Sequence, residues 1–171
     1  MDKNIVLIGM PGCGKSTVGV VLAKAMGYDF VDSDLVIQKQ YDKKLEEIID
    51  QVGSEKFNEI EEDVNAHLDV EKSIIATGGS VIYGPKAMKH LAEIGIIFYI
   101  KLTYEEIENR LGSLKERGVS IKEGQTLRDL YNERIPLYEK YADIVIDTSD
   151  KDVRESVFLI MEKLKEAGNV L

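Results

Sequence analysis

The sequence predicts an α/β fold, a three-layer sandwich in which a five-stranded parallel sheet lies between helices. Short apolar runs alternate with longer amphipathic segments along the chain, which is typical of parallel strands joined by helices. The short runs are rich in β-branched residues, as expected of strands buried on both faces. The chain has 171 residues with no Ser/Gly-rich linker and no internal repeat, so we expect residues 1–171 to form a single domain.

The first two strands and the helix between them are predicted from the apolar pattern and from the glycines that end two of these elements. Residues 4–9 are a string of Ile, Val and Leu that ends in glycine, which predicts a buried strand. Residues 15–26 carry their apolar side chains on one stripe and are followed by Gly27, so they predict a helix with its stop. A second short strand is predicted at residues 28–31.

The middle of the chain is predicted to be helical and then to return to the sheet. Residues 33–70 have helical periodicity throughout, with a break near Gly53. Residues 73–77 predict a third strand, which Gly78-Gly79 ends. Pro85 is suited to the first turn of a helix, so we expect a helix over residues 85–93.

The last part of the chain repeats the same alternation. Residues 96–102 (Ile-Ile-Phe-Tyr-Ile-Lys-Leu) form the most distinct strand pattern of the sequence. A polar segment at residues 112–125 has little apolar content and separates two helical patterns. The remaining predicted elements are helices at 104–110, 127–141 and 153–166 and a fifth strand at 144–147.

Composition excludes several classes of protein. Acidic residues outnumber Lys plus Arg by 31 to 22, giving a net charge of −9, which disfavours binding to nucleic acid or to an anionic membrane. One cysteine, Cys13, forms no internal disulfide, and with two histidines it provides no zinc site. His67 and His90 have no partner at suggestive spacing, so we expect them at the surface. Because neither a membrane span nor a secretory signal is recognisable, we expect a cytoplasmic protein. We also expect it to be a monomer.

Residues 9–17 (Gly-Met-Pro-Gly-Cys-Gly-Lys-Ser-Thr) match the phosphate-loop pattern G-x-x-x-x-G-K-[ST] between a predicted strand and a predicted helix. Glycines let successive backbone N–H groups converge on an oxyanion, and the helix N-terminus adds its positive end. Lys15 is expected to reach the terminal phosphates and Ser16 to offer its hydroxyl to Mg²⁺. The pattern therefore predicts a nucleotide site.

Further polar residues follow the predicted strands, where ligands of such sheets bind. Asp32 and Asp34 could serve magnesium and a nucleophilic hydroxyl, or Ser33 could cap a helix with an acid in its first turn. Gly78-Gly79 could admit a small ligand or form a plain turn.

Two cationic regions lie further along the chain. The segment 112–125, which holds Lys115, Arg117 and Lys122, could be a lid over the transferring phosphoryl group or a solvated loop. Arg134 could bind an anionic substrate or lie at the surface.

Together these pieces resemble the shikimate kinase family, within the nucleoside-monophosphate-kinase-like branch of phosphate-loop proteins. The resemblance extends from about Asn4 to Asp147. It matches the family patterns D-x-D, G-E-x-x-F-R-x-x-E, G-G-G and R-x-P-L-Y. Its carriers here are residues 12–17, 30–34, 53–61, Gly78-Gly79, Arg117 and 134–138.

The resemblance implies a phosphate-loop kinase with strand order 2-3-1-4-5 and a mobile lid at residues 112–125. It implies that ATP phosphorylates a small acidic hydroxyl compound, shikimate, to shikimate 3-phosphate in aromatic amino-acid biosynthesis. The implied cofactor is Mg²⁺, held by Ser16 and Asp32, and the implied catalytic residues are Lys15, Asp34 and Arg117. The implied ATP-binding residues are Gly12, Cys13, Gly14, Lys15, Ser16, Thr17, Arg110 and Arg117. The implied substrate-binding residues are Asp34, Asn58, Glu61, Gly78, Gly79 and Arg134.

The chain departs from the family patterns at Asn58, Ser80, Ser54 and Gly118. Asn58 stands where the family has a second carboxylate-binding arginine, and an asparagine makes no charged bidentate contact. A lost charge-assisted hydrogen bond is worth about 1.5–3 kcal/mol, so an arginine at position 58 would tighten binding of an acidic acceptor by roughly tenfold or more if that position faces the carboxylate.

Two alternatives remain open from the sequence. One is a kinase for another small hydroxyl compound, such as a hydroxy amino acid or a sugar acid, with Asn58 and Ser80 reshaping the pocket. The other is a regulatory protein that binds ATP and phosphorylates nothing. A protein that only binds ATP has no need of Asp34, Arg117 or Arg134, which favours an enzyme.

Overall fold

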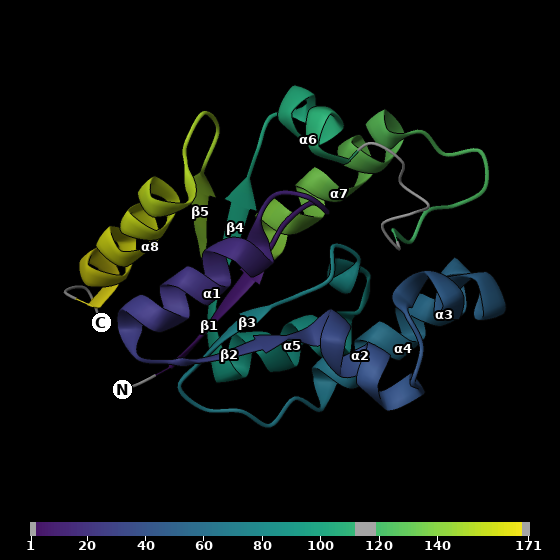
Figure 1. The fold of residues 1–171 in the computed structure, drawn as a ribbon, viewed down its shortest axis with the longest axis horizontal. Helices are drawn as coiled ribbons and strands as arrows, with labels where there is room; N and C mark the ends of the chain where they lie inside the picture. The colour runs from purple at the N-terminus through teal and green to yellow at the C-terminus, as the bar shows by residue number, and fades with distance from the viewer. Residues whose placement is uncertain (1–2, 112–118, 169–171) are drawn as a thin grey trace.

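The computed structural model describes residues 3–111 and 119–168, whose strands form one five-stranded parallel sheet (Figure 1). The strand order is β2-β3-β1-β4-β5, as the resemblance implied. The strands are β1 (Asn4–Ile8), β2 (Asp29–Asp32), β3 (Ser73–Ala76), β4 (Gly95–Lys101) and β5 (Ile144–Asp147).

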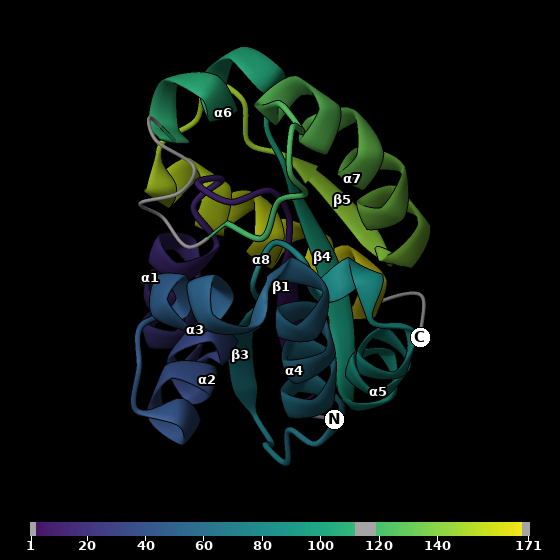
Figure 2. The same ribbon diagram turned by 90° about the vertical axis from the view of Figure 1, so that its right-hand side faces the viewer.

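Helices cover both faces of the sheet, so the three-layer arrangement is confirmed (Figures 1 and 2). Helices α1 and α8 pack on one face, and α5 and α7 lie on the other. The helices are α1 (Lys15–Met26), α2 (Ser33–Tyr41), α3 (Leu45–Val52), α4 (Ser54–Ala66), α5 (Pro85–Ile94), α6 (Tyr104–Leu111), α7 (Leu127–Tyr141) and α8 (Val153–Gly168). A short 3₁₀ helix, η1 (Val81–Tyr83), follows β3 and was not expected.

The register between the central strands aligns the ends from which the site is built. Asp32 at the end of β2 pairs with Ala76 at the end of β3, and Leu7 of β1 also pairs with Ala76. Because parallel strands end at the same edge, the loops that follow β1, β2 and β3 begin side by side.

Two apolar cores hold these layers together. The larger core surrounds the sheet, where β1 and most of β4 are buried on both faces, which explains their unbroken apolar sequence. A smaller core joins helices α2, α3 and α4 beside the sheet through Ile37, Ile48, Phe57 and Val64. The second core holds α4 against α2 and α3 next to the carboxyl ends of the strands.

The prediction that residues 33–70 are helical with one break near Gly53 is wrong in part. The segment contains three helices, and only the break at Gly53 was expected. The additional break occurs after Tyr41, because Asp42 adopts a left-handed conformation (φ 51°) that ends α2. Helix α4 ends at Ala66, and the chain then returns to β3 without further helix.

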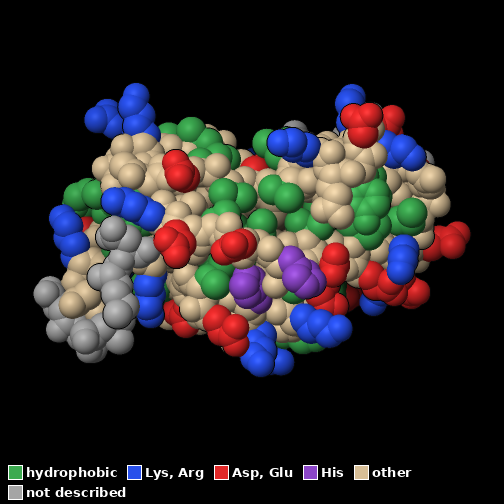
Figure 3. All heavy atoms as spheres, turned by 90° about the horizontal axis from the view of Figure 1, so that it is seen from below, with side chains coloured by type: hydrophobic (Ala, Val, Ile, Leu, Met, Phe, Trp, Pro, Cys, Tyr) green, Lys and Arg blue, Asp and Glu red, His purple; other side chains and the backbone are tan. Residues whose placement is uncertain are grey.

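Neither histidine lines the cleft described below, and the face seen in Figure 3 shows histidine among acidic side chains. His67 lies at the surface as expected, whereas His90 is half-buried. The ring of His67 is 76% exposed, and His90 contacts the carbonyl oxygen of Leu68 through Nε2 at 2.8 Å. Within the described ranges 3–111 and 119–168, no helix is long and apolar enough to cross a membrane.

Candidate active site

A cleft of about 580 Å³ opens at the carboxyl ends of β1, β2 and β3. Its walls come from the loop after β1, helices α2 and α4, the turn after β3, helix α6, residues 119–120 and helix α7. The sequence-predicted residues that line it are Gly12, Gly14, Lys15, Ser16, Thr17, Asp34, Glu61, Gly78, Gly79, Arg110 and Arg134. The structure therefore brings most of the predicted site into one cavity.

The phosphate loop has the backbone that its glycines predicted. Gly12 (φ 76°) and Gly14 (φ 97°) are left-handed, and helix α1 begins directly after them. The buried ammonium group of Lys15 donates to the carbonyl oxygens of Gly9 and Met10 at 2.8 and 2.9 Å, so the lysine lies along the loop itself. This geometry leaves the helix N-terminus facing the cleft, as an anion site requires.

Cys13 lies in the same loop, but its side chain is buried and does not line the cleft. Its sulfur atom is 3.7 Å from Nζ of Lys15. If Cys13 contacts ATP, as the resemblance implied, it does so through its backbone and not through its side chain.

Asp32 connects the loop to helix α2. One carboxylate oxygen accepts hydrogen bonds from the backbone N–H groups of Asp34 and Leu35, so Asp32, and not Ser33, is the N-cap of α2. The other oxygen accepts from the hydroxyl of Ser16 at 2.8 Å. Asp32 therefore caps helix α2 and also lies beside Ser16. The sequence had left helix capping and a site beside the phosphate loop as alternatives for the segment 32–34. A hydroxyl and a carboxylate held together are hard oxygen donors of the kind that suits Mg²⁺.

Asp34 and Glu61 converge on the turn after β3. A Cβ atom on Gly78 would collide with Glu61 Oε1 and would lie 2.6 Å from Asp34 Oδ1, so a side chain here would displace both carboxyl groups. Glu61 is buried, and its other oxygen accepts a hydrogen bond from the hydroxyl of Ser80. Glu61 Oε1 has no hydrogen-bond partner among the described residues. Glycine at 78 thus makes room for two acids in one corner of the cleft.

Burial changes the protonation of these two acids. It raises the pKa of Asp34 to about 6, and the charge of Asp32 adds to the rise while Lys15 opposes it. Burial raises the pKa of Glu61 to about 8, and the charge of Asp34 adds to that rise while the hydrogen bond from Ser80 opposes it. Burial therefore favours the protonated form of both acids, and of Glu61 more than of Asp34.

Glu61 is expected to make the protein less stable as pH rises from about 4.5 to 8. In that window the folded state keeps the proton and the unfolded chain releases it, so the free energy of unfolding falls by at most about 1.4 kcal/mol per pH unit from this group. Urea unfolding at several pH values should show a flatter dependence for Glu61→Gln than for the wild type. The matched control is Glu55→Gln, an exposed acid on the same helix, which should keep the wild-type slope. An unchanged slope in Glu61→Gln would show that Glu61 ionises normally.

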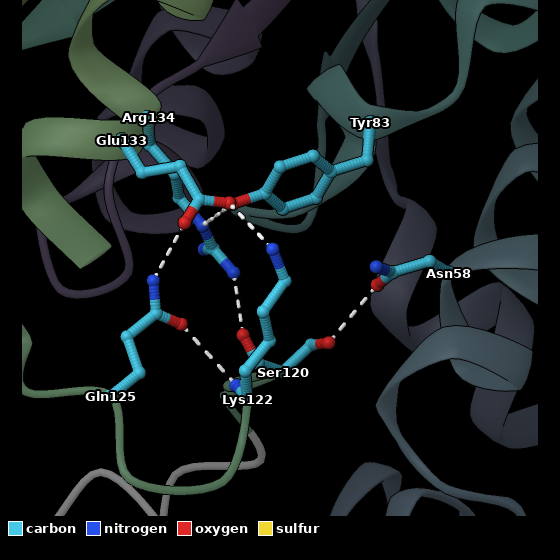
Figure 4. Close-up of polar contacts among 7 residues, drawn as sticks. All are labelled: Asn58, Tyr83, Ser120, Lys122, Gln125, Glu133 and Arg134. Atoms are coloured by element: carbon cyan, nitrogen blue, oxygen red, sulfur yellow. Dashed lines mark hydrogen bonds and ion pairs between the residues drawn. The ribbon is translucent and has the colours of Figure 1, made fainter. Parts of the chain in front are cut away.

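Arg134 is one of the cationic residues that line the cleft and is only 1% exposed. Its Nε donates to the hydroxyl of Tyr83 at 3.4 Å, and its NH2 donates to the carbonyl oxygen of Ser120 at 2.6 Å (Figure 4). Its NH1 faces Gly79, where a Cβ atom would approach it to 2.9 Å. A buried guanidinium at the wall of a cleft is suited to binding a carboxylate.

Besides Cys13, two of the predicted residues that the structure describes are absent from the cleft lining. Asp32 reaches the site through Ser16, and Asn58 contacts Ser120, which does line the cleft. Arg117 lies outside the described residues, so its catalytic and ATP-binding roles stay predictions. Arg110 lines the cleft and donates to the carbonyl oxygen of Gly12 at 3.5 Å.

Sequence reasoning missed several residues that shape the site. Ser120, Val119 and Phe57 line the cleft, and Tyr83 holds Arg134. Tyr138 donates to the carbonyl oxygen of Gly79 at 2.6 Å, which secures the turn after β3. Two of them had a signal in the sequence, because Phe57 belongs to the G-E-x-x-F-R-x-x-E pattern and Tyr138 to the R-x-P-L-Y pattern.

The fold and this cleft define a class of protein, a phosphate-loop kinase that acts on a small molecule. The nucleotide loop, the two acids and the buried arginine face one cavity of a size suited to a small ligand. The chain belongs to the shikimate kinase family, whose model matches residues 11–165.

Individual relatives agree with this assignment. The chain is 38% identical over 168 residues to a shikimate kinase of Thermodesulfovibrio yellowstonii, covering 95% of this chain and 96% of that protein. It is 36% identical over 171 residues to a shikimate kinase of Francisella tularensis subsp. novicida, covering 95% and 97%.

Solved structures show the same fold. The shikimate kinase from Acinetobacter baumannii in complex with shikimate superposes with a TM-score of 0.88 at 31% identity, covering 96% of this chain and 94% of that one. The shikimate kinase from Aquifex aeolicus superposes with a TM-score of 0.83 at 29% identity, covering 98% of each chain.

Proposed function

We propose that this protein transfers the terminal phosphoryl group of ATP to a hydroxyl group of shikimate, giving shikimate 3-phosphate and ADP. The observation that carries the proposal is the buried Arg134 in the same cleft as the phosphate loop and Asp34. A nucleotide alone does not need this buried arginine in addition to Lys15 and the helix N-terminus, whereas an acidic acceptor does. The bound shikimate in the similar structure from Acinetobacter baumannii supports the choice of acceptor.

The loop residues are proposed to bind the phosphates of ATP. The N-terminus of α1 lies at the space where negative charge moves from the terminal phosphate to the leaving ADP. The ammonium group of Lys15, which donates to the carbonyl oxygens of Gly9 and Met10 in this structure, is proposed to turn to the phosphates when ATP binds. Arg110, at the rim, is proposed to contact the adenine. Ser16 and Asp32 would hold a magnesium ion, which neutralises phosphate charge when it is bound.

Asp34 is proposed to orient the acceptor hydroxyl and to take its proton. The acceptor oxygen forms a bond to the terminal phosphorus as the bond from that phosphorus to the bridging oxygen breaks, and ADP leaves. With a pKa of about 6, Asp34 is mostly ionised at neutral pH and can accept the proton. Glu61 holds its own proton at that pH and can therefore donate a hydrogen bond to a second hydroxyl.

An acceptor panel tests the proposal. ADP release with Mg-ATP is measured against shikimate, a hydroxy amino acid and a sugar acid, and the product is identified by NMR. We expect turnover with shikimate at low concentration, loss of turnover in Asp34→Ala, and phosphate on the 3-hydroxyl. Turnover with another acceptor alone would refute shikimate as the substrate, and ATP binding with no acceptor-dependent turnover would refute the kinase.

A further inference from the structure

Asn58 does not reach the cleft directly. It is half-buried on α4, between Phe57 and Glu61 in sequence, and those two residues line the cleft whereas Asn58 does not. Its Oδ1 accepts a hydrogen bond from the hydroxyl of Ser120 at 3.0 Å (Figure 4). The residue that replaces an arginine of the family pattern therefore serves here as a hydrogen-bond acceptor.

Ser120 extends this contact to the guanidinium of Arg134. The hydroxyl of Ser120 is held by Asn58, and its carbonyl oxygen accepts from Arg134 NH2 at 2.6 Å. Ser120 is only 6% exposed, so both bonds are shielded from water. The three residues connect helix α4 to helix α7 across the wall of the cleft.

The remaining contacts of Arg134 leave one end of its side chain for a ligand. Nε is bound to Tyr83, whose hydroxyl donates to Glu133 at 2.8 Å, and NH2 is bound to Ser120. NH1 lies against Gly79 at the cleft. The direction in which NH1 points therefore depends on where the Ser120 carbonyl is held.

We propose that Asn58 and Ser120 are positioning residues for the acidic substrate: Asn58 holds Ser120, and Ser120 aims Arg134 at the substrate carboxylate. The inference rests on the proposed function. Asparagine suits this role because it offers an acceptor oxygen to the hydroxyl, whereas an arginine side chain has donors only. An arginine at position 58 would remove the acceptor to which Ser120 now donates and would place a second positive charge near Arg134.

The test is a set of variants assayed for KM and kcat. Asn58→Ala and Ser120→Ala should each raise the KM for shikimate roughly threefold to tenfold, the range for one neutral hydrogen bond. The double variant should be no worse than either single variant, because both break the same link. The kcat and the KM for ATP should stay within about twofold of the wild type. This is expected when a variant weakens binding of the acceptor by the same amount in the ground state and in the transition state.

Two further variants separate this role from general structural damage. Ser120→Thr keeps the hydroxyl and should keep the KM close to the wild-type value, and Asn132→Ala, an exposed asparagine on α7, is the matched control. Asn58→Arg should raise the KM for shikimate. A lowered KM in Asn58→Arg would show that position 58 faces the carboxylate directly and would overturn the proposal, as would multiplicative effects in the double variant.

Turnover of shikimate by the wild type is measured first, so that failure of the proposed function is recognised separately. The link itself is then read without substrate, from urea unfolding of the wild type, the two alanine variants and the double variant. Non-additive destabilisation supports the link, and additive destabilisation overturns it whichever acceptor the enzyme uses.

Discussion

Asp34→Asn is expected to lower kcat by roughly 10²–10⁴-fold while ATP affinity stays within about twofold. Asparagine keeps the size of the side chain but cannot take the proton of the acceptor hydroxyl. Among the described residues, the side-chain hydrogen bonds of Lys15 and Ser16 do not involve the side chain of Asp34. Nucleotide binding should therefore survive the substitution. Steady-state ADP release gives kcat, and calorimetric titration gives the affinity for ATP.

The control for this variant is Asp50→Asn, which removes an exposed carboxylate from helix α3 outside the cleft. It should retain wild-type kcat. A loss smaller than about tenfold in Asp34→Asn would mean that the hydroxyl loses its proton without this carboxylate, and the role of Asp34 would then be limited to orientation.

Arg134→Gln is expected to raise the KM for shikimate about thirtyfold or more, with a smaller change in kcat. Removing one partner of a buried, hydrogen-bonded charge pair costs at least about 2 kcal/mol, which corresponds to that factor. The effect should be specific to the charge of the acceptor. A carboxamide analogue of shikimate should bind the wild type poorly and should lose little further affinity in the variant.

Arg128→Gln provides the matched control, because Arg128 lies on the same helix, is half-exposed and does not line the cleft. It should leave both KM values unchanged. If Arg134→Gln discriminates between acid and amide as strongly as the wild type does, the carboxylate binds elsewhere and Arg134 serves only to hold the 119–120 segment.

Much of the fold could be predicted because its signals are local. Unbroken β-branched runs predict strands buried on both faces, and glycine or proline at the element ends sets their limits to within about one residue. Helix α7 and strand β5 have the predicted bounds. The end of α2 was missed because it depends on Asp42, an aspartate in a left-handed conformation, and no glycine signals the turn.

In the candidate site too, features that are local in sequence could be predicted and contacts between distant segments could not. The phosphate loop was predictable since strand, loop and helix are consecutive in sequence. The contacts that hold Arg134 were not, because Tyr83 and Ser120 are brought to it only by the packing of η1 and residues 119–120 against α7. Position 58 shows the limit of a pattern most clearly: its place in the motif predicted a contact with the substrate, and the structure shows a contact with Ser120.

The register of β2 and β3 has a consequence for how this chain tolerates changes in length. Asp34 and Gly78 each lie two residues beyond a registered pair, Asp32 and Ala76, so the segments that carry them leave the sheet at the same level. An insertion in residues 67–72, at the opposite edge, would lengthen a connection and leave that match intact. An insertion of one residue at 77, in contrast, would move the turn by about 3.3 Å against both acids. The length of the chain is thus constrained more tightly at the edge of the sheet that carries the cleft than at the other edge.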